Sequence, residues 1–466
     1  MEKTAQIEEK IAGKAVQRCI LPGCGAAFGL TERIYVCAKC GGPLEIEFDF
    51  AAEKKLPSAA ALKKLWLERG ASAEARDRSG VWRYRELLPF DEAAPIVTLF
   101  EGNTPIYDAP RSARYCGMDA LRLKHQGCNP TGSFKDTGMT AAVTQAVIVG
   151  ARVTVCASTG NTAASLAAYS ARAGLQAAIL LPRGQITSSK LAQSMDYGAS
   201  IFELEGNFDE CMRLIQELGD DPSIYVANSV NPFRIEGQKT VAYEMMQQCG
   251  WTVPDHVVVP GGNLGNSSAL GKGFDEMRRL GLIDRMPKLS VIQAEGAAPL
   301  AHLFSELAVS QSAEDRRLPD TMKTVKDPHT LATAIKIGSP VSWRKALRTV
   351  LKSGGKVIAV NEQEIADAKA MIGRDGIGCE PASATTVAGI KKLVTAGHIR
   401  KGESVVAVLT GHVLKDPDYV AQYHRGTLAL DRGAEGVQAI AGTFRNVPQR
   451  VAANKAAVLE KLNQRR

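Results

Sequence analysis

A lysine at the start of a predicted helix is the first candidate for chemistry in this chain. Residues 129–132 (Asn-Pro-Thr-Gly) form a turn signal, and Ser133 followed by Asp136 predicts a helix start with an acidic capping box. Lys135 would lie in the first turn, where the positive end of the helix dipole favours the neutral amine. A neutral lysine amine forms a Schiff base with an aldehyde. The alternative for Lys135 is a solvated surface lysine.

Two further strand-to-helix connections carry groups that suit an anion. Residues 158–162 (Ser-Thr-Gly-Asn-Thr) offer hydroxyl and backbone N–H groups for a carboxylate or a phenolic oxygen. Residues 261–266 (Gly-Gly-Asn-Leu-Gly-Asn) follow a predicted strand at 256–260, and their spacing suits one phosphate rather than a dinucleotide. The alternatives are ordinary N-capping by Ser158 or Thr159, and a glycine-rich turn without a ligand.

Two more polar positions lie at the ends of predicted elements. One follows a predicted strand, and the other precedes a predicted helix. Thr410 lies at the carboxyl end of the apolar run 404–409, where an ordinary capping threonine is the alternative. Residues 228–234 form a polar loop that brings Arg234 to the start of a helix. An arginine there predicts an anion site, and a surface arginine is the alternative.

Four cysteines near the N-terminus form two pairs with metal-ligand spacing. They are Cys19, Cys24, Cys37 and Cys40, with adjacent glycines that allow tight turns. This spacing predicts a ribbon that holds a structural zinc ion, and four sulfur ligands leave no position for catalysis. The alternative is a ribbon of four reduced cysteines that keeps its shape without metal.

Composition narrows the class of protein. The 466 residues predict about three domains, and 45% hydrophobic with 23% charged residues is typical of a soluble globular protein. The net charge of +8 includes no run of five Lys or Arg residues, so no nucleic-acid partner is expected. The chain contains no stretch of 18 apolar residues, and its N-terminus is polar. These two features predict a cytoplasmic protein without membrane contact. The remaining cysteines are scattered singly, as thiols of that compartment would be.

Predicted strands and helices alternate from residue 81 onward. This alternation predicts an α/β fold with parallel sheets that carry helices on both faces. Such sheets bind ligands beyond the carboxyl ends of their strands, which is where 158–162, 261–266 and Thr410 would lie.

Together these motifs resemble the threonine synthase family. Residues 129–136, 157–165, 261–266 and 410–415 carry the resemblance, which extends from about residue 99 to 424. It implies pyridoxal 5′-phosphate as cofactor and the fold of the tryptophan synthase β-chain class, fold type II. The cysteine ribbon also occurs in this family. The implied divisions are a ribbon (1–50), a linker helix (51–80), a large doubly wound domain (81–139 with 231–425), a small one (140–230) and a C-terminal helical tail (426–466).

The resemblance also implies a role for each matched position. Lys135 would be the Schiff-base lysine and would shuttle protons. Asn161 would bond the ring hydroxyl oxygen of the cofactor, and the Thr410 hydroxyl would face its pyridine nitrogen without enforcing a protonated ring. The other implied contacts are to the cofactor phosphate (Gly262, Asn263, Leu264, Gly265 and Asn266), to the substrate carboxylate (Ser158, Thr159 and Thr162) and to the phosphate of O-phosphohomoserine (Asn228, Arg234 and Lys124).

The implied reaction converts O-phospho-L-homoserine and water into L-threonine and phosphate. Many relatives carry arginine where this chain has Thr137, which shifts the phosphate contact to Arg234 and Lys124. The alternatives are another lyase of fold type II, either a serine/threonine dehydratase or a cysteate synthase, and a zinc-ribbon binding protein whose inactive lyase domain senses a ligand. The fold class implies a homodimer. Activation by S-adenosylmethionine, a property of the plant-type branch, is not decided by any residue noted above.

Overall fold

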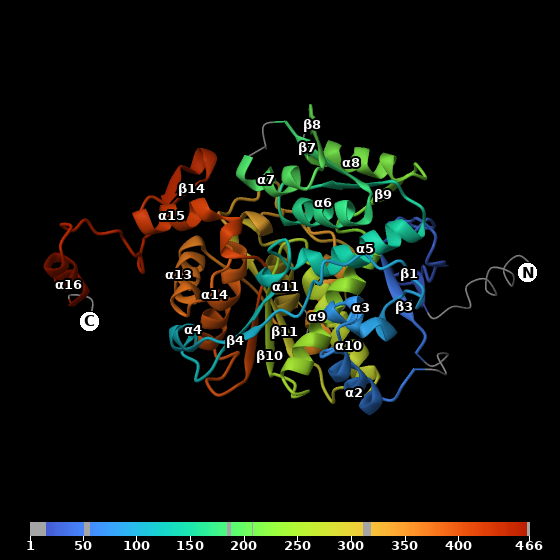
Figure 1. Ribbon diagram of the computed structural model, residues 1–466, viewed down its shortest axis with the longest axis horizontal. Helices are drawn as coiled ribbons and strands as arrows, with labels where there is room; N and C mark the ends of the chain where they lie inside the picture. Colours follow the sequence, from blue (N-terminus) through green and yellow to red (C-terminus); the bar gives the residue numbers. More distant parts are fainter. Residues whose placement is uncertain (1–14, 51–55, 184–187, 207, 311–317, 464–466) are drawn as a thin grey trace, which may run out of the picture.

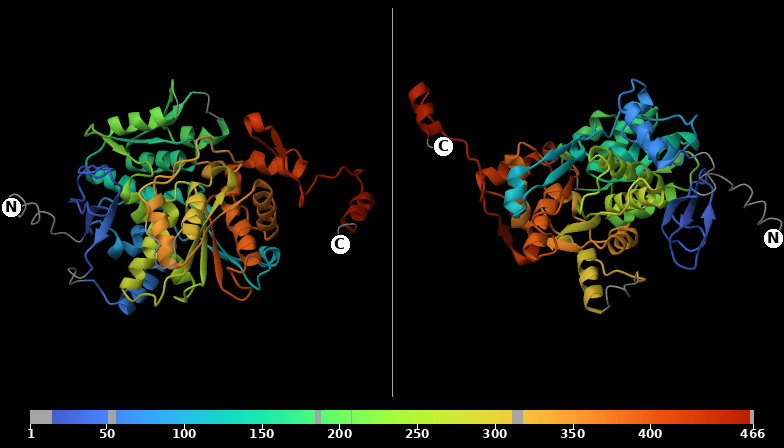
Figure 2. Two further views of the ribbon diagram at one scale, coloured as in Figure 1. Left: turned by 180° about the vertical axis from the view of Figure 1, so that it is seen from behind. Right: turned by 90° about the horizontal axis from the view of Figure 1, so that it is seen from below.

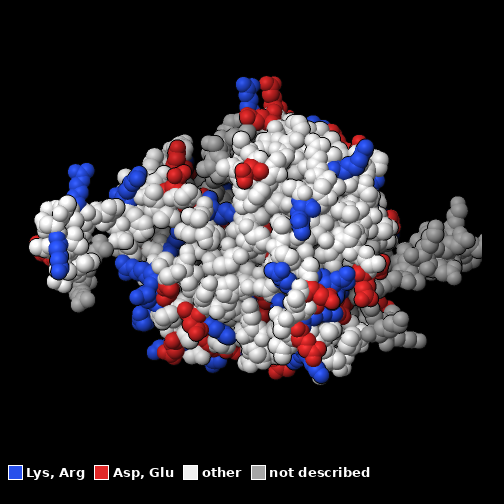
Figure 3. Space-filling view, in the orientation of Figure 1, with Lys and Arg blue, Asp and Glu red and all other residues white. Residues whose placement is uncertain are grey.

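Two sheets, one mostly and one entirely parallel, lie one above the other in Figure 1 and organise the protein. The structure is a computed structural model that describes residues 15–50, 56–183, 188–206, 208–310 and 318–463. The N-terminal residues that entered the cytoplasmic prediction lie outside these ranges. No helix of the described residues has the length and apolar character needed to cross a membrane. Acidic and basic side chains are interspersed on the face shown in Figure 3.

The larger sheet has six strands, and alternate residues of its central strand pack into different cores. In order across the sheet the strands are β12 (Val357–Val360), β11 (Lys288–Ala294), β10 (His256–Pro260), β13 (Val405–Leu409), β5 (Arg122–His125) and β4 (Ile106–Asp108). All neighbours are parallel except β4, which pairs antiparallel with β5. Val257 and Val259 pack in one core and Val258 in the other, as the two-residue period of a strand requires.

The smaller sheet is entirely parallel. Its order is β8 (Ser200–Leu204), β7 (Gln176–Pro182), β6 (Val153–Ala157) and β9 (Ile224–Val226). Cys156 faces one core and Val155 the other, so helices cover both faces of this sheet as well. Every strand of the smaller sheet lies within 140–230, and the strands of the larger one lie within 81–139 and 231–425.

Helices cover the sheets and connect them. The α-helices are α2 (Ala59–Arg69), α3 (Ala75–Arg78), α4 (Pro110–Cys116), α5 (Lys135–Ile148), α6 (Asn161–Ala173), α7 (Ser188–Asp196), α8 (Phe208–Leu218), α9 (Pro232–Gln248), α10 (Gly265–Arg279), α11 (Pro299–Ser310), α12 (Trp343–Ser353), α13 (Glu362–Arg374), α14 (Pro381–Thr395), α15 (Pro417–Arg425) and α16 (Lys455–Asn463). Short 3₁₀ helices are η1 (Trp82–Leu87), η2 (Gln126–Cys128), η3 (Glu295–Ala297), η4 (Thr333–Ile335), η5 (Val413–Lys415) and η6 (Gly433–Glu435).

Helix α9 lies between α5 and α10 and holds them together closely. A Cβ atom at Gly237 of α9 would overlap the carbonyl oxygen of Thr137 in α5. On its other side, a Cβ atom at Gly273 of α10 would lie 2.7 Å from the carbonyl oxygen of Lys239. Both approaches need glycine because any side chain would push the helices apart. The starts of α5, α9 and α10 are therefore fixed relative to one another.

The two ends of the chain pack differently on this body. The ribbon strands β1 (Ala15–Cys19), β2 (Ala27–Phe28) and β3 (Leu44–Phe48) form an antiparallel sheet in the order β2-β1-β3. Lys345 of α12 donates to the Leu44 carbonyl, and Arg348 pairs with Glu45, so the ribbon is docked on α12. At the other end, a hairpin of β14 (Ala429–Asp431) and β15 (Val437–Ala439) precedes α16, which stands apart from the body in both views of Figure 2.

A buried ion pair joins the larger sheet to α9. Lys124 of β5 is completely buried and pairs with Glu244 of α9. Its ammonium also donates to the Thr104 carbonyl (2.6 Å) and to Gln248 Oε1 (2.9 Å). These bonds use all three donors of the lysine. The structure therefore contradicts the prediction that Lys124 holds the substrate phosphate, and gives it a structural role.

Replacement of one member of this pair should unfold the protein more easily. Glu244→Gln leaves the Lys124 ammonium buried without its anion, so we expect a loss of about 3–5 kcal/mol in the free energy of unfolding, measured by urea denaturation. The matched control is Glu217→Gln, in the exposed pair with Arg213, which should cost at most about 1 kcal/mol. Equal losses in the two variants would contradict the structural role of Lys124.

Candidate active site

The starts of α5 and α10 and the end of β13 converge beside α9. The Gln238 side chain lies close to α5 on one side, 2.6 Å from where a Cβ of Gly138 would stand, and to Gly265 of α10 on the other, at 3.7 Å. Ser133, just before α5, forms a β-bridge with Gly411, the residue after Thr410. The structure thus brings Lys135, the 261–266 loop and Thr410 into one neighbourhood.

Lys135 is the first residue of α5, and its amine is easily neutralised. Burial and the nearby Arg234 guanidinium lower the pKa of the Lys135 amine to about 7. The predicted capping box is wrong in both halves, because the N-cap residue is Phe134 rather than Ser133 and Asp136 does not reach back to the helix start. Its carboxylate accepts from the Thr131 backbone N–H (2.7 Å) and hydroxyl (2.6 Å) instead, and so stiffens the preceding turn. The Nζ of Lys135 lies 4.4 Å from the centre of the Phe134 ring.

Arg234 carries a buried charge without an acidic partner. Its side chain is 2% exposed, donates from Nη1 to the Ala227 carbonyl (3.0 Å), and has no hydrogen bond at Nε. Burial lowers the pKa of Arg234 to about 10. No carboxylate among the described residues forms an ion pair with it. The acidic group whose charge acts on Lys135 is Glu380, and burial raises the pKa of that carboxyl group, so Arg234 and Lys135 together form a site for an anionic ligand.

The 261–266 segment runs into the first turn of α10, which begins at Gly265, and contains an unpartnered amide. Leu264 has a left-handed backbone (φ 65°), which turns the chain into α10 at Gly265. The Asn266 side chain is 5% exposed, yet both of its polar atoms lack hydrogen-bond partners among the described residues. Buried polar atoms normally have partners, and a helix start attracts phosphate. The loop therefore fits the phosphate of a cofactor.

The 158–162 segment presents half-buried hydroxyl groups. Ser158 Oγ accepts from the Gly160 N–H (3.2 Å), and the side chains of Thr159 and Thr162 form no hydrogen bond with any described residue. Asn161 and Thr162 belong to the first turn of α6 rather than to the loop. Their side chains therefore lie at a helix start, where an anion is favoured.

Asn228 supports this segment from behind. Its Oδ1 accepts from the Ala157 N–H (3.1 Å), and its Nδ2 lies 3.4 Å from the sulfur of Met212. These contacts hold the end of β6, so Asn228 positions the residues that follow it. The Asn228 Nδ2 carries two hydrogens and at most one of them is used by the Met212 sulfur, so the direct contact between Asn228 and a substrate phosphate stays a prediction.

A directed chain of hydrogen bonds ends on Glu380, a residue that the sequence analysis missed. Ser383 Oγ accepts from the N–H groups of Thr410 (2.8 Å) and Gly411 (3.1 Å), so its hydrogen points to Thr410 Oγ1 (3.0 Å). Thr410 then donates to Glu380 Oε1 (3.0 Å), and Asn161 Nδ2 donates to Glu380 Oε2 (2.9 Å). Glu380 thus links the two residues predicted to hold opposite sides of the cofactor ring.

Burial governs the protonation of Glu380. The carboxyl group is 2% exposed, and its burial raises the pKa above the usual range, while bonds from Asn161 and Thr410 act in the opposite direction. The only sequence signal at this position is Glu380-Pro381, which is typical of a helix start. That signal predicts the start of α14 and not the contact with Thr410.

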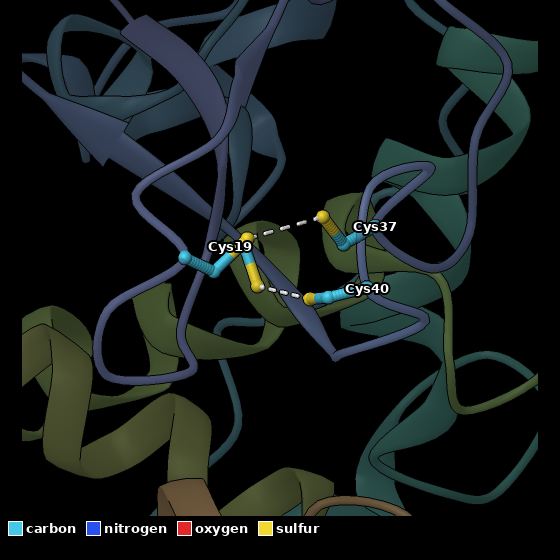
Figure 4. A group of neighbouring side chains, drawn as sticks. Cys19, Cys37 and Cys40 are labelled. Atoms are coloured by element: carbon cyan, nitrogen blue, oxygen red, sulfur yellow. Dashed lines mark hydrogen bonds between the residues drawn. The ribbon is translucent and has the colours of Figure 1, made fainter.

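The four N-terminal cysteines form a compact cluster, as predicted. Their sulfur atoms all lie within 4.8 Å of one another, and Cys19 and Cys40 are 3.5 Å apart (Figure 4). Cys24 and Cys37 are 3.7 Å apart. A tetrahedral zinc ion with Zn–S bonds of about 2.3 Å places its sulfur ligands about 3.8 Å apart. The cluster therefore has the dimensions of a Cys₄ metal site.

Comparison with known proteins agrees with this geometry. A family model described as pyridoxal-phosphate dependent enzyme matches residues 97–411. Threonine synthase of Methanocaldococcus jannaschii is 46% identical over 404 residues, which cover 86% of this chain and 93% of that protein. Threonine synthase of Methanosarcina acetivorans is 41% identical over 416 residues, which cover 89% and 96%.

Solved structures share the fold at lower identity. The threonine deaminase isoform 2 of Solanum lycopersicum superposes with a TM-score of 0.56 at 19% identity, covering 66% of this chain and 79% of that one. Maize serine racemase superposes with a TM-score of 0.54 at 20% identity, covering 67% and 89%. These similarities confirm the predicted fold class. The extent and identity of the sequence matches show that the chain belongs to the threonine synthase family of pyridoxal-phosphate dependent enzymes.

Proposed function

We propose that this protein converts O-phospho-L-homoserine and water into L-threonine and phosphate with bound pyridoxal 5′-phosphate. The observation that carries the proposal is the unpaired Arg234 guanidinium next to the readily neutralised Lys135 amine, beside the 261–266 loop. The relatives named threonine synthase support the choice of reaction within the fold class.

The cradle for the cofactor would be made by residues that already lie together. Asn266 and the N–H groups of the 261–266 loop would bind its phosphate, since the Asn266 amide atoms lack other partners among the described residues. Asn161 and Thr410 would bond opposite sides of its ring, and Lys135 would hold its aldehyde carbon. When bound, pyridoxal phosphate supplies an electron sink that stabilises negative charge at the substrate α-carbon.

Lys135 is the proton carrier of the proposed reaction. Its amine has a pKa of about 7, so at neutral pH it can both take a proton and give it back. We propose that it removes the α-proton of the substrate and later shuttles a proton from the β-carbon to the γ-carbon, which becomes the methyl group of threonine after phosphate has left. A lysine with an ordinary pKa of about 10.4 would stay charged and could not act as the base.

Arg234 is proposed to bind the substrate phosphate and to receive it as the leaving group. Its guanidinium has an unused Nε donor and no acidic partner among the described residues. Thr137, at the place where many relatives carry arginine, donates to the Phe134 carbonyl (2.9 Å) instead. Since Lys124 is fully engaged elsewhere, Arg234 is the principal cation for this phosphate. Ser158, Thr159 and Thr162 would hold the substrate carboxylate.

We propose that a lone pair of the Thr410 hydroxyl oxygen faces the pyridine nitrogen of the cofactor ring. Its hydrogen is committed to Glu380, and it already accepts one hydrogen from Ser383. A second lone pair remains, and a lone pair accepts a hydrogen rather than donating one. The resemblance implied a Thr410 contact that does not enforce a protonated ring. A Thr410 hydroxyl that accepts a hydrogen bond instead favours protonation of the ring nitrogen.

We also propose a zinc ion at the cysteine cluster, a homodimer and a cytoplasmic location. The spacing of the four sulfur atoms supports zinc. Exposed apolar residues on α16, among them Leu459 (46% exposed) and Leu462 (57% exposed), support contact with a second copy. The cysteines of the described residues are all free thiols, which is typical of a reducing compartment.

The uptake of pyridoxal phosphate by the apoenzyme should depend on pH with a midpoint near the pKa of Lys135, about 7. Because this pKa is lowered, the reactive neutral amine predominates above pH 7 and is lost below it. The rate of uptake, measured by absorbance and by borohydride trapping, should rise through neutral pH and then level off. Lys135→Ala should abolish trapping and turnover, whereas Lys401→Ala, at an exposed lysine, should change neither. Full turnover in Lys135→Ala would refute the mechanism.

Arg234→Met should weaken turnover of O-phosphohomoserine and raise the stability of the apoenzyme. Loss of a charged hydrogen bond to the substrate phosphate should raise KM for O-phosphohomoserine by roughly 10–100-fold. Removal of an unpaired buried charge should also stabilise the apoenzyme by about 1 kcal/mol or more in urea denaturation. Arg278→Met, at an exposed position of α10, is the control and should change neither quantity. An unchanged KM in Arg234→Met would exclude the phosphate contact.

The reaction itself is tested by substrate choice. Purified holoenzyme should release threonine and phosphate from O-phosphohomoserine, and turn over serine and phosphoserine much more slowly. Release of ammonia from serine or threonine at a comparable rate would favour a dehydratase instead.

Metal removal should weaken the ribbon without removing the cofactor. Wild-type protein should contain one zinc ion per chain by elemental analysis, and Cys37→Ala should contain none. That variant should unfold at lower temperature yet keep the yellow colour of bound pyridoxal phosphate, because the cluster lies in a separate module. Cys128→Ala, which removes an exposed cysteine outside the cluster, should keep its zinc. Zinc retained in Cys37→Ala would refute the predicted ligand set.

A further inference from the structure

A cavity separate from the candidate active site, which we call the second cavity, is lined by the C-terminal part of the chain. It has a volume of about 720 Å³, within the range of about 300–1,000 Å³ that small-molecule sites occupy. Its walls come from α13, α15, residues 444–449 and the connection at Gly378 and Cys379. Helices α13 and α15 stand together in Figure 1, on the side from which the C-terminal segment leaves the body. None of the residues assigned above to the cofactor or the substrate lines this cavity.

The lining of this second cavity is basic and aromatic. Its ionisable side chains include Lys369, Arg374 and Arg445, and it includes neither Asp nor Glu. Lys369 forms no hydrogen bond or ion pair with a described residue, and its Nζ lies 5.8 Å from the centre of the Tyr419 ring. The Arg374 guanidinium lies 5.0 Å from the centre of the Phe444 ring. Cations and rings together suit a ligand that is both anionic and aromatic.

Tyr419 gives an independent sign of a missing polar partner. The residue lines the cavity and is only 7% exposed, and its hydroxyl group has no hydrogen-bond partner among the described residues. A buried tyrosine hydroxyl usually finds a partner, since leaving it unpaired costs about 1–3 kcal/mol. An oxygen of a bound anion would supply that partner.

The second cavity shares a wall with the Glu380 hydrogen-bond chain. Gly378 and Cys379 lead directly into Glu380, and Val413 follows Thr410 by three residues. Gly378 and Val413 are packed so closely that a Cβ at Gly378 would lie 2.8 Å from the Val413 Cβ. A ligand that pushes on this wall therefore acts on both partners of the bond between Glu380 and Thr410.

We propose that this second cavity binds a small aromatic anion and that its occupancy alters the active site through residues 378–380. The ring of the ligand would pack against Tyr419 and Phe444. Its phosphate, sulfonate or carboxylate group would be held by Lys369, Arg445 and the Tyr419 hydroxyl. This site goes beyond the proposed reaction and does not depend on the identity of the substrate.

The binding test uses the fluorescent aromatic anion 8-anilinonaphthalene-1-sulfonate with the holoenzyme. We expect one dye molecule per chain. The double variant Lys369→Met/Arg445→Met should weaken binding at least about tenfold, and Tyr419→Phe about threefold. The matched control Lys401→Met/Arg278→Met removes two exposed cations elsewhere and should leave the affinity unchanged. The neutral dye N-phenyl-1-naphthylamine should bind the wild type at least about tenfold more weakly.

Equal dye affinity in the wild type and the Lys369→Met/Arg445→Met variant would overturn the site. That result would place the dye elsewhere, for instance on the exposed apolar residues of α16. Equal affinity for the neutral and the anionic dye would overturn the anion requirement.

The coupling test uses the visible absorbance of bound pyridoxal phosphate. Saturation of the second cavity with the anionic dye should shift that absorbance in the wild type and leave it unchanged in the Lys369→Met/Arg445→Met variant. Dye binding without a spectral shift would overturn the link through residues 378–380. Because dye binding is read on the holoenzyme without turnover, a failure here is distinct from a failure of the proposed reaction.

Discussion

Unbalanced positive charge beside α9 is the constraint on which the rest of the site depends. Most buried ionic groups of this helix have partners: Lys239 lies 2.6 Å from Glu236 and 2.8 Å from Glu276, and Glu244 pairs with Lys124. Arg234, on the same helix, has no such partner among the described residues. Burial of an unpaired charge is costly, so the protein gives up stability at this point. Binding of an anionic ligand would balance the Arg234 charge, which explains why the protein keeps an unpaired guanidinium there.

The packing of α9 turns that local charge into a site. Glycines at 237 and 273 allow α9 to approach α5 and α10 so closely that Lys135 and the 261–266 loop lie beside Arg234. The pKa of Lys135 then depends on burial first and on the Arg234 charge second. The same helix contacts the N-terminal ribbon directly, since Phe233 packs with Ile46 and Phe48 of β3. Lys272 of α10 adds a bridge, because it bonds both Glu236 and the Ile46 carbonyl. The ribbon, α9 and α10 therefore share one network of buried charges.

Glu380 is a second buried ionisable residue on which the site depends. It joins Asn161 of α6 to Thr410 at the end of β13, and so connects the smaller sheet to the larger one across the site. The connection that carries Glu380 also lines the second cavity. A residue that bonds both sides of the site and borders a separate cavity is well placed to transmit a change between them.

The sequence by itself determined the alternation of strands and helices, the cysteine spacing and the placing of Lys135 in the first turn of a helix. These features depend on neighbours within a few residues, whose turn, capping and periodicity signals are local. It also predicted that the Lys135 amine would be neutralised, although it assigned this to the helix dipole rather than to burial and Arg234.

Only the tertiary structure decided which polar groups are free to meet a ligand. Lys124 resembled a phosphate ligand, but Glu244, 120 positions away, uses its charge in the core. Glu380 showed no local signal of its bonds to Asn161 and Thr410, because those bonds span 219 and 30 positions of the chain. Partners so distant are brought together by the packing of whole helices and sheets, and no local pattern of residue types specifies that packing.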